Sequence, residues 1–304
     1  MLATQKQYVQ WQENKDGNET LHQARWLSES NHMPPARIVL IDDKTTADEA
    51  YRLACEGTSL LWRGDFHNAK QLLQALNRRI ERTNERSEQR KIKKAANQSA
   101  NSNKTAAESS ELSKDIPNLF HQQRQIQAQR ARILSRLLLE LDANYVSQLR
   151  RAPDVSTACI AAFGELKESC VLSFRDLQGA LGAAQWREKG VPIESLGLSI
   201  FPHYGVFAPT RHEYVQLLLD APLPKIHDVA YDIGTGTGLL AIILAQRGVK
   251  QVIATDLNPH ALACASENFT RQGLANVQLQ QADLYPTDAP LANLIVCNPP
   301  WLPA

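Results

Sequence analysis

A glycine-rich segment in the last quarter of the chain is the first pattern that predicts chemistry. Gly234, Gly236 and Gly238 alternate with threonine and follow the apolar run Asp228–Ile233. Glycines directly after a strand let the backbone pass close to a ligand, and the N-terminus of a following helix offers free N–H groups. The segment therefore predicts a pocket for a nucleotide-type ligand.

Asp256 supports this prediction by its position. It ends the apolar run Gln251–Asp256 and lies twenty residues after Gly236. An acidic side chain at that distance accepts hydrogen bonds from both ribose hydroxyls of a nucleotide. A helix N-cap before Pro259 remains open as a structural alternative for this aspartate.

Two further polar groups follow the next two apolar runs. Asp283 and Leu284 come after Val277–Gln281, and the sequence Asn298-Pro299-Pro300-Trp301 comes directly after Leu294–Cys297. Ligands of parallel sheets bind at the carboxyl ends of the strands, so these groups are expected beside the glycine loop. A plain turn remains open as the role of Asp283.

The Asn-Pro-Pro-Trp sequence predicts the type of reaction. The nitrogen of a planar NH2 group is a poor nucleophile because its lone pair is delocalised. The Asn298 side-chain oxygen and the Pro299 carbonyl can hold the two hydrogens and orient the lone pair, and such orientation can supply up to ~7–11 kcal/mol. Trp301 offers a face on which a flat acceptor stacks. A proline-rich loop with a core tryptophan is the structural alternative.

Alternating strands and helices are expected to position these residues. The predicted order is strand, glycine loop, helix, strand, helix, strand, strand, which indicates an α/β fold with a Rossmann-like, doubly wound parallel sheet of order 3-2-1-4. The expected elements are strands at Asp228–Ile233, Gln251–Asp256, Val277–Gln281 and Leu294–Cys297, with helices at Leu239–Gln246 and Ala261–Asn268.

The remainder of the chain divides by composition. Residues 1–81 are predicted to be a mainly helical N-terminal region, in which Arg37–Ile41 is a strand or a buried extended segment. Residues 82–117 contain few apolar side chains and are predicted to be a flexible low-complexity insertion. Residues 118–200 are predicted to hold a long amphipathic helix through Tyr145 and a connector. Residues 201–304 form the domain that carries the motifs.

A basic run lies at the start of the low-complexity segment. Between Arg78 and Lys94 the chain has eight basic residues and three acidic ones. Such a local excess can contact phosphates. A solvated helix end is the alternative.

Composition limits the class of protein. The 304 residues exceed one ordinary domain, and a net charge of +1 gives no overall attraction to nucleic acid or membrane. The N-terminus lacks a secretory pattern, and no apolar run reaches the ~20 residues of a membrane helix. Five scattered cysteines without Cys-x-x-Cys and eight histidines without ligand spacing predict no metal site, and they favour the cytoplasm.

From about Phe201 onward, the motifs quoted above resemble those of class I S-adenosylmethionine-dependent methyltransferases. Asn298-Pro299-Pro300-Trp301 is similar to the motif of the N-methyltransferase branch, which includes enzymes acting on DNA adenine, on RNA bases and on a glutamine of peptide-chain release factors. The resemblance implies S-adenosylmethionine as cofactor. It also implies a planar NH2 group of a protein glutamine or a nucleic-acid base as acceptor.

The resemblance also assigns roles to residues. It places the methionine portion of the cofactor at Asp232, Gly234, Gly236 and Gly238, the ribose at Asp256, and the adenine at Asp283 and Leu284. Asn298, Pro299 and Trp301 are the expected catalytic residues, with Asn298 also beside the cofactor. Phe207 lies in Pro202–Tyr214, which resembles a segment that packs beside the cofactor in the release-factor enzymes.

Two other functions stay open at this stage. A nucleotide-dependent oxidoreductase would place its third loop glycine where Leu239 stands, which weakens that hypothesis. A non-catalytic cofactor-binding or scaffold fragment is the other alternative, because the family's sheet has seven strands and only four are predicted here. The sheet is thus expected to be incomplete after the fourth strand. The sequence leaves open the acceptor, the oligomeric state and completion by another chain.

Overall fold

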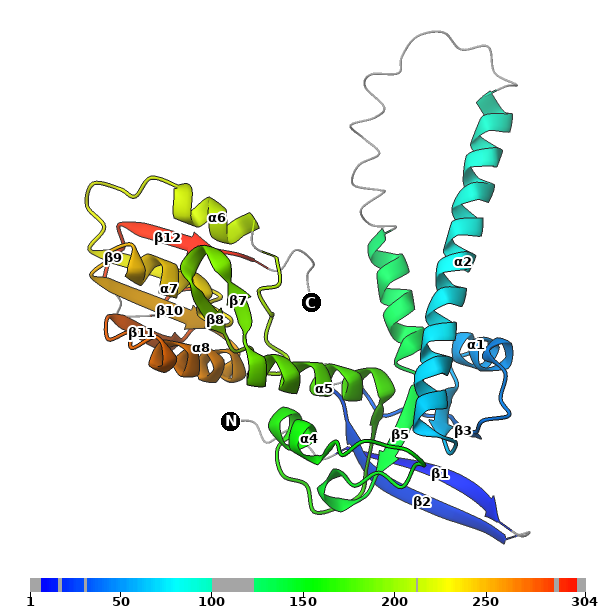
Figure 1. Ribbon diagram of the computed structural model, residues 1–304. Coiled ribbons are helices and arrows are strands. Elements are labelled where there is room, and N and C mark those ends of the chain that lie inside the picture. The colour runs from blue at the N-terminus through cyan, green and yellow to red at the C-terminus, as the bar shows by residue number, and fades with distance from the viewer. Residues whose placement is uncertain are drawn as a thin grey trace. The chain divides into compact units, whose positions relative to one another are not determined.

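The computed structural model describes residues 7–15, 18–29, 32–99, 123–211, 213–286 and 290–299. The chain forms two compact units (Figure 1). Unit 1 comprises Met1–Ser156 and Phe163–Gln178, and unit 2 comprises Thr157–Ala162 and Gly179–Ala304. Each unit is described by itself.

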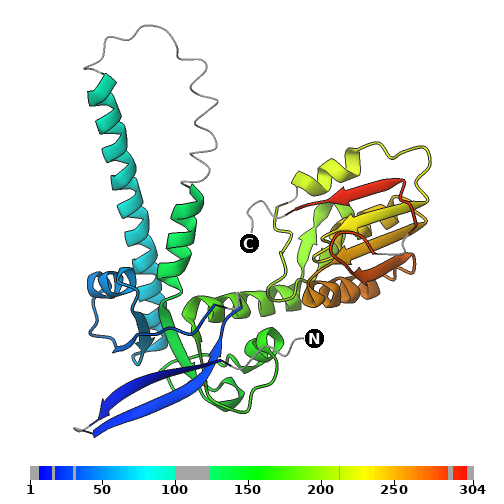
Figure 2. The same ribbon diagram turned by 180° about the vertical axis from the view of Figure 1, so that it is seen from behind.

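Unit 1 is built on a six-stranded mixed sheet of order β1-β2-β6-β5-β4-β3. Its first two strands form the long blue hairpin in Figure 2. Its strands are β1 (Tyr8–Lys15), β2 (Asn18–Leu27), β3 (Ile38–Ile41), β4 (Ser59–Trp62), β5 (Leu137–Leu141) and β6 (Cys170–Ser173). β1 and β2 form an antiparallel hairpin, and β3, β4 and β5 run parallel. The other elements that begin in this unit are α1 (Ala47–Cys55), α2 (Phe66–Ser99), a helix at residues 123–134, η1 (Ala143–Tyr145), α4 (Ser156–Phe163) and α5 (Phe174–Lys189).

This sheet corrects the prediction of a mainly helical N-terminal region. The β1–β2 hairpin buries only alternate side chains, such as Val9 and Trp11, among polar residues. That period-2 pattern is typical of a half-exposed strand, and the polar composition of the segment hides it. Of the two alternatives predicted for Arg37–Ile41, a strand or a buried extended segment, the structure has the strand, β3.

Two further corrections concern the middle of the chain. The predicted long helix through Tyr145 ends at residue 134, and Leu137–Leu141 is the buried strand β5. A short run of leucines fits both a buried helix and a buried strand, so periodicity alone misassigned it. Conversely, α2 continues to Ser99 into the predicted flexible insertion, because Glu, Lys, Arg, Gln and Ala favour helix. The rest of that insertion, residues 100–117, lies outside the described residues.

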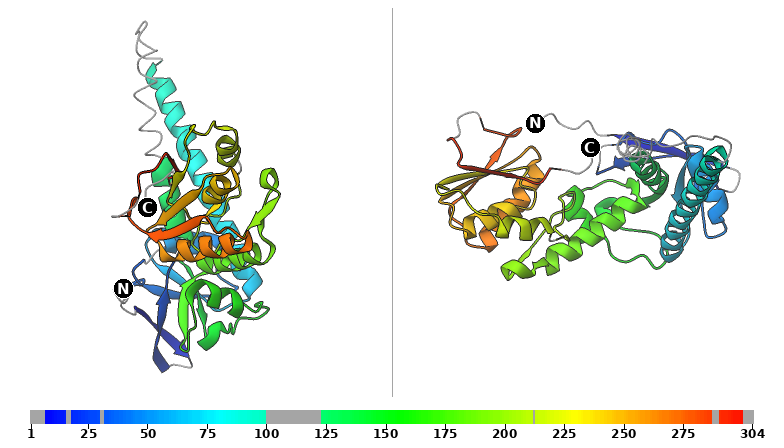
Figure 3. Two further views of the ribbon diagram at one scale, coloured as in Figure 1. Left: turned by 90° about the vertical axis from the view of Figure 1, so that its left-hand side faces the viewer. Right: turned by 90° about the horizontal axis from the view of Figure 1, so that it is seen from above.

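Unit 2 contains the predicted parallel sheet. Its strands are β9 (Val229–Ile233), β10 (Gln251–Asp256), β11 (Val277–Gln281) and β12 (Leu294–Cys297), and their order β11-β10-β9-β12 confirms the predicted 3-2-1-4. All three pairings are parallel. The other elements are the hairpin of β7 (Val191–Ile193) and β8 (Leu198–Ile200) joined by η2 (Glu194–Leu196), with α6 (Glu213–Asp220), α7 (Leu239–Gln246) and α8 (Pro259–Arg271) (Figure 3).

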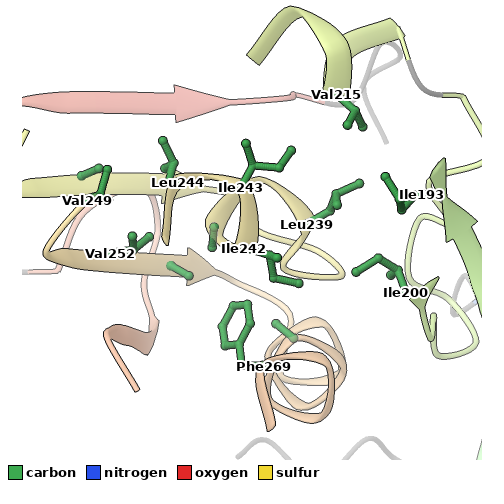
Figure 4. Close-up of a cluster of buried hydrophobic side chains, with 14 of the residues drawn as sticks. Ile193, Ile200, Val215, Leu239, Ile242, Ile243, Leu244, Val249, Val252 and Phe269 are labelled. Carbon is green, nitrogen blue, oxygen red and sulfur yellow. The ribbon is translucent and has the colours of Figure 1, made fainter. Parts of the chain in front are cut away.

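The core of unit 2 surrounds α7. This helix is apolar on nearly all sides, and Leu239, Ile242, Ile243 and Leu244 are each at most 2% exposed. Figure 4 shows these side chains between β10, α8 and the β7–β8 hairpin, with Phe269 of α8 below the helix. Because α7 is held on several sides, the glycine loop before it has a rigid support.

Within the described residues, no helix combines the length and apolar character needed to cross a bilayer.

Candidate functional site

The site lies where the four parallel strands of unit 2 end. Cys297 of β12 and Thr255 of β10 both pair with Ile233 of β9, and Asp256 pairs with Gln281 of β11. The segments that follow these strands therefore start at one edge of the sheet. They are the glycine loop, the turn after Asp256, the turn at Asp283 and the Asn298-Pro299 segment.

The three loop glycines all have left-handed backbone conformations, with φ of 70°, 55° and 84° at Gly234, Gly236 and Gly238. A Cβ at Gly238 would lie 2.5 Å from the Phe269 ring, so this glycine permits close packing of α8. A Cβ at Gly234 would meet nothing within 4 Å, and one at Gly236 only a backbone oxygen at 4.0 Å. The first two glycines thus border open space that a ligand can enter.

Asp232 is buried directly beneath this loop and is 1% exposed. Its Oδ2 accepts hydrogen bonds from the Thr235 hydroxyl at 2.7 Å and the Ala241 amide at 3.1 Å. Its Oδ1 is buried and has no hydrogen-bond partner among the described residues. Burial raises the pKa of Asp232 to about 6, and the charge of Asp256 adds to that increase.

Asp256 joins the second strand to the glycine loop. Its Oδ2 accepts the Gly236 amide at 3.0 Å, and its Oδ1 accepts the Asn258 amide at 2.9 Å. The helix N-cap itself is Asn258, whose side chain accepts from the amide of His260. Asp256 is therefore not the helix N-cap, and it lies half-buried beside the glycine loop.

The turn after β11 lies beside the end of β10. Thr255 donates its hydroxyl to the Leu284 carbonyl at 2.9 Å, and the Thr235 amide donates to the Thr255 carbonyl at 2.8 Å. Leu284 has a φ of 69° and is 57% exposed, and Asp283 is exposed. One buried threonine thus connects the glycine loop to the turn that carries the predicted adenine-binding residues.

Asn298 and Pro299 directly follow β12, next to the strand that leads into the glycine loop. Asn298 is half-buried and Pro299 is exposed, and the Asn298 side chain makes no hydrogen bond to the residues that the structure describes. The predicted stacking residue Trp301 lies outside the described residues.

The structure does not connect the predicted site residue Phe207 to the glycine loop. It lies between β8 and α6, its side chain is 64% exposed, and no described hydrogen bond or ring contact joins it to the glycine loop. Phe201, at the start of the segment that contains Phe207, is connected to the glycine loop through Asn268 of α8. The Asn268 side chain accepts the Phe201 amide at 2.9 Å and donates to the Thr237 carbonyl at 3.0 Å.

Asn268 is a residue that the sequence reasoning missed. It is 1% exposed and lies on the apolar face of α8 with Ala261, Cys264 and Ala265. A polar residue at an apolar helix position is the signal that would have revealed it. Thr235 and Thr255 were also missed, although buried threonines beside a loop and a strand end are typical supports of such sites.

A cluster of charged residues around Glu267, next to Asn268, connects α8 to α5 and to the segment at His203. Glu267 accepts from His203 at 2.8 Å, Arg187 at 3.0 Å and Arg271 at 2.9 Å. Burial favours a higher pKa for Glu267, but these bonds and the Arg187 charge outweigh it and lower the pKa to about 2. The carboxylate is therefore charged at neutral pH and fixes the segment at His203.

Residues 197–302 match the methyltransferase small domain family. A Methanocaldococcus jannaschii protein named as a protein N5-glutamine methyltransferase is 33% identical over 36% of this chain and 55% of its own length. The release factor glutamine methyltransferase of Vibrio cholerae is 37% identical over 36% of this chain and 38% of its own length. Among solved structures, the YcgJ protein of Bacillus subtilis is 26% identical over 29% of this chain and 38% of that chain, with a TM-score of 0.26.

The chain thus spans between about a third and a half of the curated relatives it matches. The family match confirms the resemblance predicted from the motifs and favours it over the oxidoreductase. The described residues also suit the cofactor that this family uses. A buried carboxylate oxygen without a partner and the open space at Gly234 and Gly236 fit a cationic ligand with a nucleoside. Residues 197–302 are therefore similar to the methyltransferase small domain family and have the α/β fold expected from the sequence.

Proposed function

We propose that this chain is an S-adenosylmethionine-dependent N-methyltransferase that acts on a planar NH2 group of a macromolecule. The observation that carries the proposal is the common edge where β9, β10, β11 and β12 end, with a glycine loop, two carboxylates and Asn298 after them. Five free cysteines agree with action in the cytoplasm.

In this proposal, Asp232, Asp256 and the glycine loop hold the cofactor. Asp256 offers its carboxylate to the ribose, and the Asp283–Leu284 turn borders the adenine. Asp232 provides negative charge beneath the loop for the methionine portion, and Phe207 covers the cofactor from the segment before α6. The bound cofactor supplies an electrophilic methyl group.

Asn298 and Pro299 then orient the acceptor. The Asn298 side-chain oxygen and the Pro299 carbonyl accept the two N–H hydrogens, so that the nitrogen lone pair is directed at the methyl group, while Trp301 stacks on the flat acceptor. The nitrogen gains a methyl group and releases one proton to solvent, so no basic side chain is required. Positioning rather than acid–base chemistry supplies the rate.

A protein glutamine is the acceptor that the relatives favour. Three of them are named as glutamine methyltransferases, two of these for release factors. A nucleic-acid base is the second candidate, and the specific observation in its favour is the excess of basic residues between Arg78 and Lys94 on α2.

The experiment incubates the chain with methyl-labelled S-adenosylmethionine and an extract of cells that lack the protein. We expect labelled N-methylglutamine after protein hydrolysis, or a labelled N-methyl base after nucleic-acid digestion if the second candidate holds. Asn298→Ala should lower the rate on the order of 10²-fold and leave cofactor affinity within about twofold.

Asn293→Ala is the matched control. Asn293 precedes β12 at the end opposite to Asn298, and its side chain accepts a hydrogen bond from the Val229 amide. It should retain the parental rate. A methyl group found on carbon or oxygen, or full activity of Asn298→Ala, would refute the orientation mechanism.

A further inference from the structure

The charges of this chain are strongly segregated. We call α2 and the helix at residues 123–134 the helical arm. The arm contains twelve basic and three acidic residues, a net charge of +9, within a chain whose net charge is +1. All other residues together therefore carry −8. The helix at 123–134 has three arginines and four glutamines and no acidic residue.

The two helices of the arm lie side by side at its base, as Figures 1 and 2 show. Arg130 donates to the Asn77 side chain at 2.8 Å and to Glu81 at 3.0 Å. Ile80 and Ile133 are buried. The arm is thus a packed part of unit 1 at this point, with a fixed outer surface.

A groove of about 470 Å³ opens at this base. Leu73 and Leu134 are its apolar members, and its polar members come from α2 and from the start of α5. These are Gln74, Asn77, Arg78, Arg175 and Gln178. Two guanidinium groups from segments far apart in the sequence therefore line one concave surface.

Three arginines of the arm form no ion pair with another residue that the structure describes. Arg78, Arg82 and Arg86 are exposed and follow each other at four-residue spacing, so they share one face of α2. None of the three has an acidic partner within 4 Å among the described residues, whereas Arg79 pairs with Asp48 and Arg130 with Glu81. The row begins at the groove and continues along the helix.

From this arrangement we infer that the helical arm and its groove bind the phosphodiester backbone of a nucleic acid. The guanidinium forks of Arg78 and Arg175 match phosphate oxygens, and the groove amides of Gln74 and Gln178 add neutral donors. The row at Arg82 and Arg86 continues the contact along a helix about 50 Å long. The inference concerns unit 1 and does not depend on methyl transfer.

A membrane surface fits this arm less well than a nucleic acid. Insertion of an amphipathic helix into lipid requires an exposed apolar face. None of the large apolar side chains that are exposed among the described residues belongs to the arm. A nucleic acid, by contrast, needs only a regular row of cations, because it repeats one charge per nucleotide.

The test measures binding of the full-length chain to a labelled single-stranded RNA and an RNA hairpin across a salt series, without cofactor. The variant Arg78→Gln/Arg175→Gln should bind about tenfold more weakly at low salt. The slope of log Kobs against log salt should become shallower by about 1.4 to 1.8, from two lost phosphate contacts. A second variant, Arg82→Gln/Arg86→Gln, should reduce the slope similarly.

The matched control is Arg37→Gln/Lys44→Gln, which removes two exposed charges from unit 1 outside the arm. It should keep the parental slope, and equal thermal midpoints should show that all variants fold. Single-stranded DNA of equal length should give the same change in slope between parent and variants, because the inferred contacts are to phosphates and not to the sugar. An unchanged slope in both arm variants would overturn the inference. So would equal or tighter binding to polyglutamate or to phosphatidylserine vesicles than to the nucleic acids.

Discussion

Burial keeps the Asp232 carboxyl easier to protonate than an ordinary aspartate. Its pKa lies near 6 because the group is enclosed. One of its oxygens has no hydrogen-bond partner among the described residues. A cation beside Oδ1 would supply the missing interaction. We therefore expect Asp232 to couple the stability of unit 2 to ligand binding.

The first prediction follows from the sign of this shift. A carboxyl whose folded pKa lies above its unfolded value of 3.8 stabilises the fold below pH 3.8, and that contribution is lost as pH rises through about 6. Relative to the parent, Asp232→Asn should therefore gain up to about 3 kcal/mol of unfolding free energy between pH 4 and pH 8. Denaturant titrations across this range measure the difference, and a flat difference would contradict the burial argument.

The parent should also bind S-adenosylmethionine more tightly as pH rises through 6, because ionised Asp232 attracts a cation. Calorimetry at pH 5 and pH 7.5 tests this. Asp232→Asn should lose that pH dependence.

The second prediction concerns Asp256. Asp256→Ala removes an acceptor predicted for the ribose and also frees the Gly236 amide. Hydrogen bonds to charged groups contribute roughly 1.5–3 kcal/mol each, so the affinity for S-adenosylmethionine should fall more than tenfold. Asp228→Ala is the control, because Asp228 is an exposed carboxylate that pairs with Lys250. Unchanged calorimetric affinity in folded Asp256→Ala would reject the ribose assignment.

At the scale of elements, the glycines of the loop differ in what surrounds them. Gly238 faces the Phe269 ring of α8, whereas Gly234 faces open space. Both have positive φ, so both substitutions strain the backbone. Only one of them also creates a steric clash.

The third prediction contrasts these two positions. Gly238→Ala should destabilise unit 2 by about 2–5 kcal/mol from strain plus overpacking, and Gly234→Ala by about 1–2 kcal/mol from strain alone. Gly234→Ala should instead weaken cofactor binding. Adding Phe269→Leu to Gly238→Ala should recover part of the lost stability in thermal unfolding. Equal losses at both glycines would disprove the distinction.

At the scale of the whole molecule, the two units have separate cores. Leu138 of β5 packs with Val9, Trp11 and Leu61 in unit 1, and Ile242 of α7 belongs to the core of unit 2. Each of these side chains is fully buried. The units are therefore expected to unfold in separate steps, as multidomain chains do.

The fourth prediction assigns those steps. Leu138→Ala should lower only the transition of unit 1 and Ile242→Ala only that of unit 2, each by about 2–5 kcal/mol. S-adenosylmethionine should raise only the transition that Ile242→Ala lowers. Calorimetry measures both, and a single transition that responds to both substitutions would contradict the prediction.

The sequence alone determined the sheet of unit 2 and the position of the glycine loop. β10, β11, β12 and α7 have the predicted bounds, and the glycine loop lies where its spacing placed it. These elements were predictable because their signals are local: short apolar runs, turn glycines and polar residues at strand ends. The roles given to Phe207, Asp283, Leu284 and the catalytic residues remain predictions.

Only the tertiary structure decided the sheet of unit 1, the buried polar contacts of unit 2 and the groove at the helical arm. The unit 1 sheet joins β2 to β6 across more than 140 residues of chain, and no local pattern specifies such a pairing. The unpartnered oxygen of Asp232 and the link from Phe201 through Asn268 to Thr237 also depend on packing between distant segments. The groove of Arg78 and Arg175 arises in the same way. Residue type determines which bonds a side chain can make, but packing determines which of those bonds remain open to a ligand.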